Sequence, residues 1–164
     1  MSYAAAVVTV SDRSFRGERE DASGPALAEA LTAAGFSVAG VSVVPDERDA
    51  VAAELRRLAD TEQVPLVLTT GGTGFAPRDI TPEATRDVIE KEAPGLAEHG
   101  RAATLAKTRF AVLSRGIAGI RGRSLILNLP GSPKGAREMF DVLAPVLPHA
   151  LKVLVEATDE HPAS

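Results

Sequence analysis

The chain contains no cysteine among its 164 residues. It can therefore form no disulfide, use no thiolate as a nucleophile and bind no metal through sulfur, which suits a reducing compartment. Histidine is also scarce, with His99, His149 and His161 far apart and without the spacing of metal ligands. We expect each histidine to be a surface or packing residue, so a histidine-based metal site is not predicted.

Long apolar runs and an excess of positive charge are absent as well. No run approaches 18 apolar residues, so no membrane-spanning helix is expected. Residues 1–13 have no basic stretch ahead of their apolar part, which predicts a strand rather than a secretory signal. The net charge of −4 argues against general binding to nucleic acid. We expect a cytoplasmic protein with neither a membrane nor a nucleic acid as partner.

The length and composition are those of one globular domain. A chain of 164 residues can bury about 70% of its unfolded surface in a single core. Apolar residues make up 45% and charged residues 24% of the chain, which is ordinary for a soluble protein. We expect a single domain over residues 1–164, with no room for further domains and with a frayed tail from about Asp159.

The most informative stretch is TTGGTGFAPRDITPEAT, from Thr69 to Thr85. It follows an apolar run, Val64 to Leu68, which predicts a short buried strand. It precedes a helix for which Thr81 is the expected N-cap and Pro82 the first helical residue. A strand, a glycine-rich turn and a helix in succession direct backbone N–H groups and a helix N-terminus toward an anion.

The residues of this loop suit a phosphate or nucleotide site. Gly71, Gly72 and Gly74 leave room for phosphates to approach the backbone, and a divalent metal could bridge Asp79 to those phosphates. The loop is not a Walker A motif, because no Gly-Lys-Ser/Thr closes it, nor a dinucleotide fingerprint, because Pro77 stands at the third glycine position. The alternative is a tight turn in which Asp79 is a solvated carboxylate.

Strand and helix patterns alternate along the whole chain, which predicts a three-layer α/β/α sandwich with a mostly parallel central sheet. Gly35 is expected at the C′ position, just after the end of the first long helix. The expected strands are 4–9, 36–44, 64–68 and 124–129, with an extended segment near 110–113. The expected helices are 23–34, 46–62, 82–90, 95–106 and a region from 132 that is broken near Pro145 and Pro148.

Polar and glycine-rich residues follow the predicted strands, where ligands bind in such folds. They are Ser11 and Asp12, Asp46, Gly71 to Gly74, Ser114 and Arg115, and Pro130 to Lys134. Structural roles are open for several of them. Asp46 is placed to cap a helix, Asp12 to pair with Arg13 or Arg16, Ser132 to cap a helix, and Lys134 to lie at the surface or to bind phosphate. Leu113 to Gly122 could be an edge strand with bulges or a subunit contact.

Six segments, in this order, resemble the molybdopterin adenylyltransferase family of the MogA and MoaB type. The resemblance also extends to the G domains of plant and animal molybdenum-cofactor proteins and runs from about Ala4 to Val155. The segments are TVSDR, VVPDE, TTGGTGFAPRDITPEAT, APGL, AVLSRGIAGIRG and LILNLPGSPKGARE.

The resemblance implies transfer of AMP from ATP to the terminal phosphate of molybdopterin, with release of pyrophosphate. It implies that Asp46 and Asp79 are the two aspartates tied to catalysis and hold Mg²⁺. The implied nucleotide-binding residues are Thr70, Gly71, Gly72, Thr73, Gly74 and Asp79. The implied contacts to the pterin and its phosphate are Ser11, Asp12, Ser114, Arg115, Ser124, Pro130, Gly131, Ser132 and Lys134. Ser132 departs from the family, in which several members carry Asn or Gln.

Two functions of other classes remain open for this chain. A catalytically silent relative would bind or carry molybdopterin without transferring AMP, which the retention of both aspartates disfavours. A nucleotide-dependent enzyme of neighbouring function would need domains for which 164 residues leave no room. The resemblance further implies a homo-oligomer, most often a trimer, and a hand-over of product to a molybdenum-insertion protein.

Overall fold

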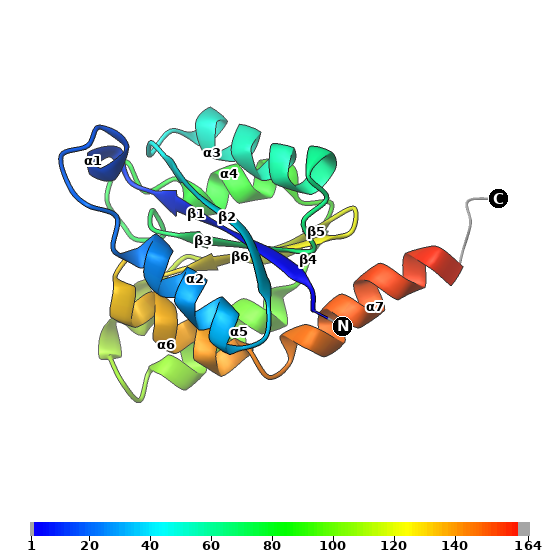
Figure 1. Cartoon of the computed structure of the whole chain (residues 1–164). Helices are drawn as coiled ribbons and strands as arrows, with labels where there is room; N and C mark the ends of the chain where they lie inside the picture. Colours follow the sequence, from blue (N-terminus) through cyan, green and yellow to red (C-terminus); the bar gives the residue numbers. More distant parts are fainter. Residues whose placement is uncertain (1, 161–164) are drawn as a thin grey trace.

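Within residues 2–160, which the computed structural model describes, six strands form one sheet in the order β2-β1-β3-β6-β5-β4 (Figure 1). The strands β1 (Ala4–Val10), β2 (Ser37–Val44), β3 (Leu66–Thr70) and β6 (Ser124–Leu129) pair in parallel. At the other edge β5 (Ala118–Arg121) runs antiparallel to β6, and the short β4 (Lys91–Glu92) runs antiparallel to β5. The sheet is therefore mostly parallel, as predicted.

The central strands are continuous apolar runs because helices cover both of their faces. All five residues of β3 and all six of β6 are buried. On one face lie α2 (Ser23–Ala33), α5 (Pro94–Thr104), α6 (Pro133–Leu143) and the start of α7 (Leu147–Glu160). On the other lie α3 (Arg48–Arg56), its π-helical extension η1 (Arg57–Thr61) and α4 (Thr81–Val88). Figure 1 shows these three layers, which confirm the predicted α/β/α sandwich.

The direction in which the chain moves across the sheet reverses after β2, although the strands concerned stay parallel. From β1 the chain crosses to β2 on one side, and from β2 it returns to β3 on the other side of β1. The loops that leave the carboxyl ends of β1 and β3 therefore diverge, and a crevice opens between them. The short helix α1 (Asp12–Phe15) lies at this end of the sheet (Figure 1).

Two expectations of secondary structure need correction. The segment near 110–113 is not extended but forms a 3-10 helix, η2 (Arg109–Leu113), capped by the Thr108 hydroxyl. The second half of the segment Leu113 to Gly122 forms the strand β5, which is not the expected edge strand, because β4 lies outside it. The alternative role as a subunit contact stays a prediction. Gly119 of β5 lies against Ile89, where a Cβ would approach the isoleucine side chain to 2.6 Å.

Helix caps were predicted with mixed success. Ser132 does cap α6, since its Oγ accepts the backbone N–H of Gly135 at 3.0 Å. Thr81 is not an N-cap: it is the first residue of α4, and its hydroxyl donates to the carbonyl of Gly71. Asp46 is not a cap either, because α3 begins two residues later and Glu47 occupies the cap position without a side-chain bond.

The C-terminal region breaks near Pro145, as predicted, between α6 and α7. The break predicted near Pro148 is wrong, because Pro148 is the second residue of α7, where a helix tolerates proline. The last helix continues to Glu160, past Asp159, where the frayed tail was expected to begin. Residues 161–164 lie outside the described part of the chain. No helix within residues 2–160 is long and apolar enough to cross a membrane.

Candidate functional site

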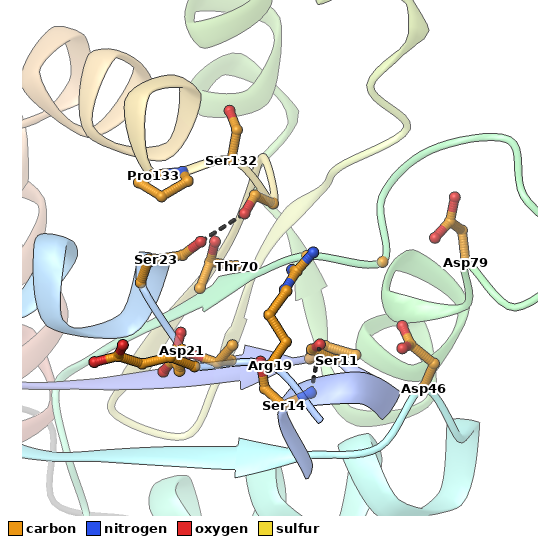
Figure 2. A pocket seen from close by; sticks show the side chains of 17 residues that line it. Ser11, Ser14, Arg19, Asp21, Ser23, Asp46, Thr70, Asp79, Ser132 and Pro133 are labelled. Atoms are coloured by element: carbon orange, nitrogen blue, oxygen red, sulfur yellow. Dashed lines mark hydrogen bonds between the residues drawn. The ribbon is translucent and has the colours of Figure 1, made fainter. Parts of the chain in front are cut away.

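A pocket of about 690 Å³ lies beyond the carboxyl ends of β1 and β3, at the switch in strand order. Figure 2 shows polar side chains of the segments after β1, β2, β3 and β6 around this pocket. The lining residues are Thr9, Val10, Ser11, Ser14, Arg19, Glu20, Asp21, Ala22, Ser23, Asp46, Thr70, Gly71, Gly72, Asp79, Gly131, Ser132 and Pro133.

Two consecutive glycines after β3 form the floor of this pocket. Gly71 has φ +101° and Gly72 has φ +69°, a conformation that residues with a Cβ rarely adopt. A Cβ on Gly71 would collide with the carbonyl oxygen of Val10, and one on Gly72 with the hydroxyl of Thr81. No acceptor within residues 2–160 takes the backbone N–H of Gly72. The turn therefore exposes a backbone donor where no side chain can block an anion.

The loop after β6 faces this glycine turn from the other side. Gly131 lies against Gly71, where a Cβ would come within 3.2 Å of the Gly71 Cα. Two buried hydroxyls fix the loop, since Thr70 donates to the carbonyl of Pro130 at 2.7 Å and Ser23 to that of Gly131 at 2.6 Å. The N-terminus of α6 follows directly, and its partial positive charge favours an anion at this point.

Asp46 reaches the pocket from the end of β2 and is tied to Asp12 by two reciprocal bonds. The Asp12 N–H donates to Asp46 Oδ2 at 2.8 Å, and the Asp46 N–H donates to Asp12 Oδ1 at 2.9 Å. Arg78 forms a two-pronged pair with Asp12, and this hydrogen bonding lowers the pKa of the Asp12 carboxyl. Arg78 thus replaces both Arg13 and Arg16 as the partner expected for Asp12.

The environment of Asp46 opposes its charge. Burial is the largest cause of a raised pKa at Asp46, and the neighbouring carboxylates of Asp12 and Asp79 raise the pKa further. The N–H of Asp12 acts in the opposite direction. A partly buried carboxylate beside two others is poorly compensated, so a cation bound here would be stabilised.

Asp79 lies on the loop between the glycines and α4, and Arg115 holds that loop. The Arg115 Nε donates to the carbonyl of Gly74 at 2.8 Å, and Nη2 to the carbonyl of Asp79 at 2.8 Å. Its Nη1 pairs with Glu83 at 2.5 Å, and its backbone N–H donates to Thr73. Two nitrogens of the guanidinium therefore fix the loop that carries Asp79, and the third binds Glu83 of α4, the helix that follows this loop.

The residues of the site fit a magnesium ion. Asp46 and Asp79 each spend Oδ2 on a backbone N–H, of Asp12 and Ala76 respectively, and Oδ1 of each has no hydrogen-bond partner within the described residues. No group of three His, Cys, Asp or Glu in residues 2–160 could hold a metal alone. Mg²⁺ commonly binds through one or two carboxylates and completes its shell with phosphates and water.

The structure brings together most of the residues expected to form the nucleotide site. Thr70, Gly71, Gly72 and Asp79 line the pocket, and Asp46 lies beside them. Thr73 is buried in the same turn, and Gly74 lies against Asp79, where a Cβ would come within 2.8 Å of the carboxylate. Neither Thr73 nor Gly74 lines the pocket, so both contribute to the shape of the turn and not to the pocket surface.

Fewer of the expected pterin and phosphate contacts reach the pocket. Ser11, Gly131 and Ser132 line it, while Asp12 and Pro130 support it through the bonds described above. Ser114, Arg115 and Lys134 do not line it: Ser114 Oγ accepts from the Gly116 N–H, and Lys134 is 88% exposed and 4.0 Å from Glu138.

The position of Ser124 contradicts the role expected for it. Ser124 begins β6, so it lies at the amino end of the strand and away from the carboxyl ends that border the pocket. Its side chain is fully buried, and its hydroxyl donates to the carbonyl of Val64 at 2.6 Å. This bond ties β6 to the start of the neighbouring strand, so Ser124 is structural.

Beyond β1, the sequence analysis missed five polar lining side chains: Ser14, Arg19, Glu20, Asp21 and Ser23. All five belong to α1, the loop that follows it, or the start of α2. This segment connects the first strand to the helix that covers the sheet, so in a parallel fold it must pass the carboxyl end of β1. That topological argument could have identified the segment, although no motif in it names the individual residues.

Comparison with known proteins agrees with this geometry. The family described as "Probable molybdopterin binding domain" matches residues 6–149. A curated relative named molybdopterin adenylyltransferase, from Helicobacter pylori (strain J99), is 43% identical over 151 residues, which cover 91% of this chain and 86% of the relative. The molybdenum cofactor synthesis protein cinnamon of Drosophila melanogaster is 47% identical over 150 residues. That match covers 90% of this chain but only 25% of the fly protein.

Solved structures show the same fold. The crystal structure of the molybdopterin biosynthesis enzyme MoaB from Thermus thermophilus superposes with a TM-score of 0.89 at 54% sequence identity. It covers 94% of this chain and 97% of the other. A molybdopterin biosynthesis protein from Mycobacterium abscessus gives a TM-score of 0.86 at 37% identity, with 96% of this chain and 97% of that chain covered.

Proposed function

The chain belongs to the molybdopterin adenylyltransferase family of the MogA and MoaB type, and from this premise we propose that it transfers AMP from ATP to the terminal phosphate of molybdopterin. The observation that supports this most strongly is the pocket itself. It joins a side-chain-free glycine turn, a helix N-terminus and two carboxylates at one edge of the sheet. The glycine turn and the helix N-terminus suit the binding of a polyphosphate, and the two carboxylates suit a magnesium-assisted transfer.

In the proposed reaction a terminal phosphate oxygen of molybdopterin attacks the α-phosphorus of ATP. A new phosphorus–oxygen bond forms, the bond from the α-phosphorus to the bridging oxygen breaks, and its electron pair leaves with pyrophosphate. The nucleophile is already an anion, so the protein needs no strong base. The lack of cysteine and the absence of histidine among the lining residues are compatible with this chemistry.

The chain's own residues contribute position and charge. Gly72 offers a backbone N–H to phosphate oxygens, and the N-terminus of α6 behind Ser132 offers a second anion site. Asp46 and Asp79 would hold Mg²⁺ through the oxygens they leave free. When bound, the metal supplies positive charge against the developing charge of the transition state. Arg115 keeps Asp79 in place by holding its loop.

The remaining features of the family are proposals for this chain as well. We propose a homo-oligomer, with a trimer favoured, that works in the cytoplasm and passes its product to a molybdenum-insertion protein. Light scattering should then give a solution mass of three chains, and a mass of one chain would contradict the trimer. The silent-carrier alternative is disfavoured because both carboxylates are present and both face the pocket.

The proposal is tested by incubating the protein with molybdopterin, ATP and Mg²⁺ and measuring pyrophosphate and adenylylated pterin. Asp79→Ala should reduce turnover about 100-fold or more, because the variant loses a metal-holding carboxylate, while pterin binding survives. Asp141→Ala is the matched control, since Asp141 is an exposed aspartate of α6 outside the pocket.

Near-normal turnover in Asp79→Ala would refute the metal role of that residue. Tight binding of molybdopterin by the unmodified protein, without any transfer of AMP, would instead identify a carrier.

A further inference from the structure

Arg19 is the one cationic side chain among the described residues that line the pocket. Four carboxylates line it as well, those of Glu20, Asp21, Asp46 and Asp79. Figure 2 shows the Arg19 side chain rising from its loop between Asp21 and Asp46 toward the glycine turn and the loop after β6. A pocket of this charge repels a polyphosphate unless a cation compensates for it.

The guanidinium of Arg19 is not engaged elsewhere. It makes no hydrogen bond or ion pair with any residue of the described range. Other cations near the site are committed: Arg78 pairs with Asp12, Arg115 holds the loop of Asp79, and Lys134 lies near Glu138 outside the pocket. Arg19 is therefore the arginine that is free to bind a ligand in this pocket.

The loop that carries Arg19 is fixed on both sides of it. Before it, the chain turns at Gly17, which has φ +75°, and the Glu18 N–H donates to the Arg13 carbonyl at 2.8 Å. After it, Asp21 accepts from the Thr9 hydroxyl at 2.9 Å and from the Gly24 N–H at 3.0 Å. These bonds use both oxygens of Asp21, which therefore anchors the loop. Because the backbone is held, the loop loses little conformational freedom when the Arg19 side chain binds a ligand.

We propose that Arg19 is a phosphate-binding residue of this pocket, which contacts the polyphosphate of the nucleotide through its guanidinium. The inference rests on the proposed function for the identity of the nucleotide, but the binding of polyphosphate can be measured without any turnover. A guanidinium presents several N–H donors in a planar fork and forms charge-assisted, two-pronged bonds with phosphate. The charge also offsets the carboxylates that would repel the same group.

The test uses inorganic pyrophosphate as the probe and isothermal titration calorimetry as the measurement, with Mg²⁺ present. Arg19→Ala should raise the Kd for pyrophosphate about tenfold or more, and Arg19→Lys should recover part of the loss. Arg13→Ala is the matched control, because Arg13 is an exposed arginine of α1 that does not line the pocket. Its Kd should equal that of the unmodified protein.

Two further readouts separate binding from folding and from catalysis. The affinity for adenosine, which has no phosphate, should be the same in Arg19→Ala and the unmodified protein, which shows that the pocket is intact. Equal Kd values for pyrophosphate in Arg19→Ala and Arg13→Ala would overturn the inference, as would a failure of the unmodified protein to bind pyrophosphate. If the unmodified protein binds pyrophosphate through Arg19 but transfers no AMP, the proposed function fails and the inference stands.

Discussion

At the scale of single residues, Asp46 is held where its charge is unfavourable. Burial and the carboxylates of Asp12 and Asp79 raise its pKa, and the Asp12 N–H and the charge of Arg78 offset this only in part. Such an arrangement costs stability in the free protein and is explained if the site is built for a cation. The sequence identified Asp46 as a site residue and also predicted that it caps a helix; the cap was wrong, because α3 begins at Arg48.

Asp46→Asn should therefore stabilise the protein while it abolishes most of the activity. Asparagine keeps a side-chain oxygen that can accept the Asp12 N–H, and it removes the repulsion between carboxylates. A raised pKa in the folded state means that the stability contributed by the protonated carboxyl is lost as pH rises through that pKa. The unfolding midpoint of Asp46→Asn should exceed that of the unmodified protein near pH 7, and the gap should narrow toward about pH 4.

Thermal denaturation in metal-free buffer measures both midpoints. An asparagine variant that is less stable than the unmodified protein near neutral pH, or a gap that does not change with pH, would contradict this account of Asp46.

Arg115 shows a limit of inference from motifs. Its position in the sequence suggested a contact to substrate, whereas its guanidinium bonds to Gly74, Asp79 and Glu83 of the protein. We predict that Arg115→Lys lowers turnover about tenfold or more, because lysine keeps the charge but cannot hold two carbonyls and a carboxylate at once. Trypsin should then cleave after Arg78, in the released loop, faster than in the unmodified protein.

The control is Arg121→Lys, since Arg121 makes a similar fork with Asp60 and the carbonyl of Val88 outside the pocket. If both lysine variants keep full turnover and the same rate of cleavage after Arg78, Arg115 does not position the loop.

At the scale of elements, the glycine turn after β3 determines the shape of the site. Gly72 combines a left-handed backbone with contact to Thr81, whose hydroxyl closes the turn onto Gly71. Gly72→Ala should cost about 1–2 kcal/mol of unfolding free energy for the left-handed conformation alone. The collision with Thr81 should add to that cost and reduce turnover, because the turn must shift.

The variant Gly122→Ala separates the cost of the left-handed backbone from the cost of the collision with Thr81. Gly122 also has a left-handed backbone, φ +55°, but a Cβ there would meet no atom within 4 Å. Chemical denaturation of both variants should show the smaller loss in Gly122→Ala, with turnover retained. Equal losses of stability and full turnover in both variants would show that the contact between Gly72 and Thr81 is unimportant.

Elements with strong local signals were predicted well, and those decided by tertiary contacts were not. Buried strands such as β3 and β6 are apolar throughout, so their sequences alone indicate them. The segment Arg109–Leu113 has the apolar residues of a strand but forms a 3-10 helix, in which Phe110 and Val112 are exposed. The role predicted for Ser124 failed because a motif does not show at which end of β6 this residue lies, and Ser124 is at the end away from the pocket.

At the scale of the whole molecule, the alternation of strands and helices was enough to predict a parallel sheet with helices on both faces. The order of strands was not predictable from pattern, since it depends on which strands cross to which side. That order creates the crevice in which the glycine turn, Asp46 and the loop after β6 come together. Topology also brings Arg19 into the pocket, although no local sequence signal marks it.

The central claim is the transfer of the α-phosphate of ATP to molybdopterin, and isotope labelling tests it most directly. The protein is incubated with molybdopterin, Mg²⁺ and ATP labelled on either the α- or the γ-phosphate, and the pterin product is isolated. We predict that label from the α-phosphate appears in the pterin product and label from the γ-phosphate appears only in released pyrophosphate. Pterin product that carries γ-label, or unlabelled pterin in both reactions, would contradict adenylyl transfer.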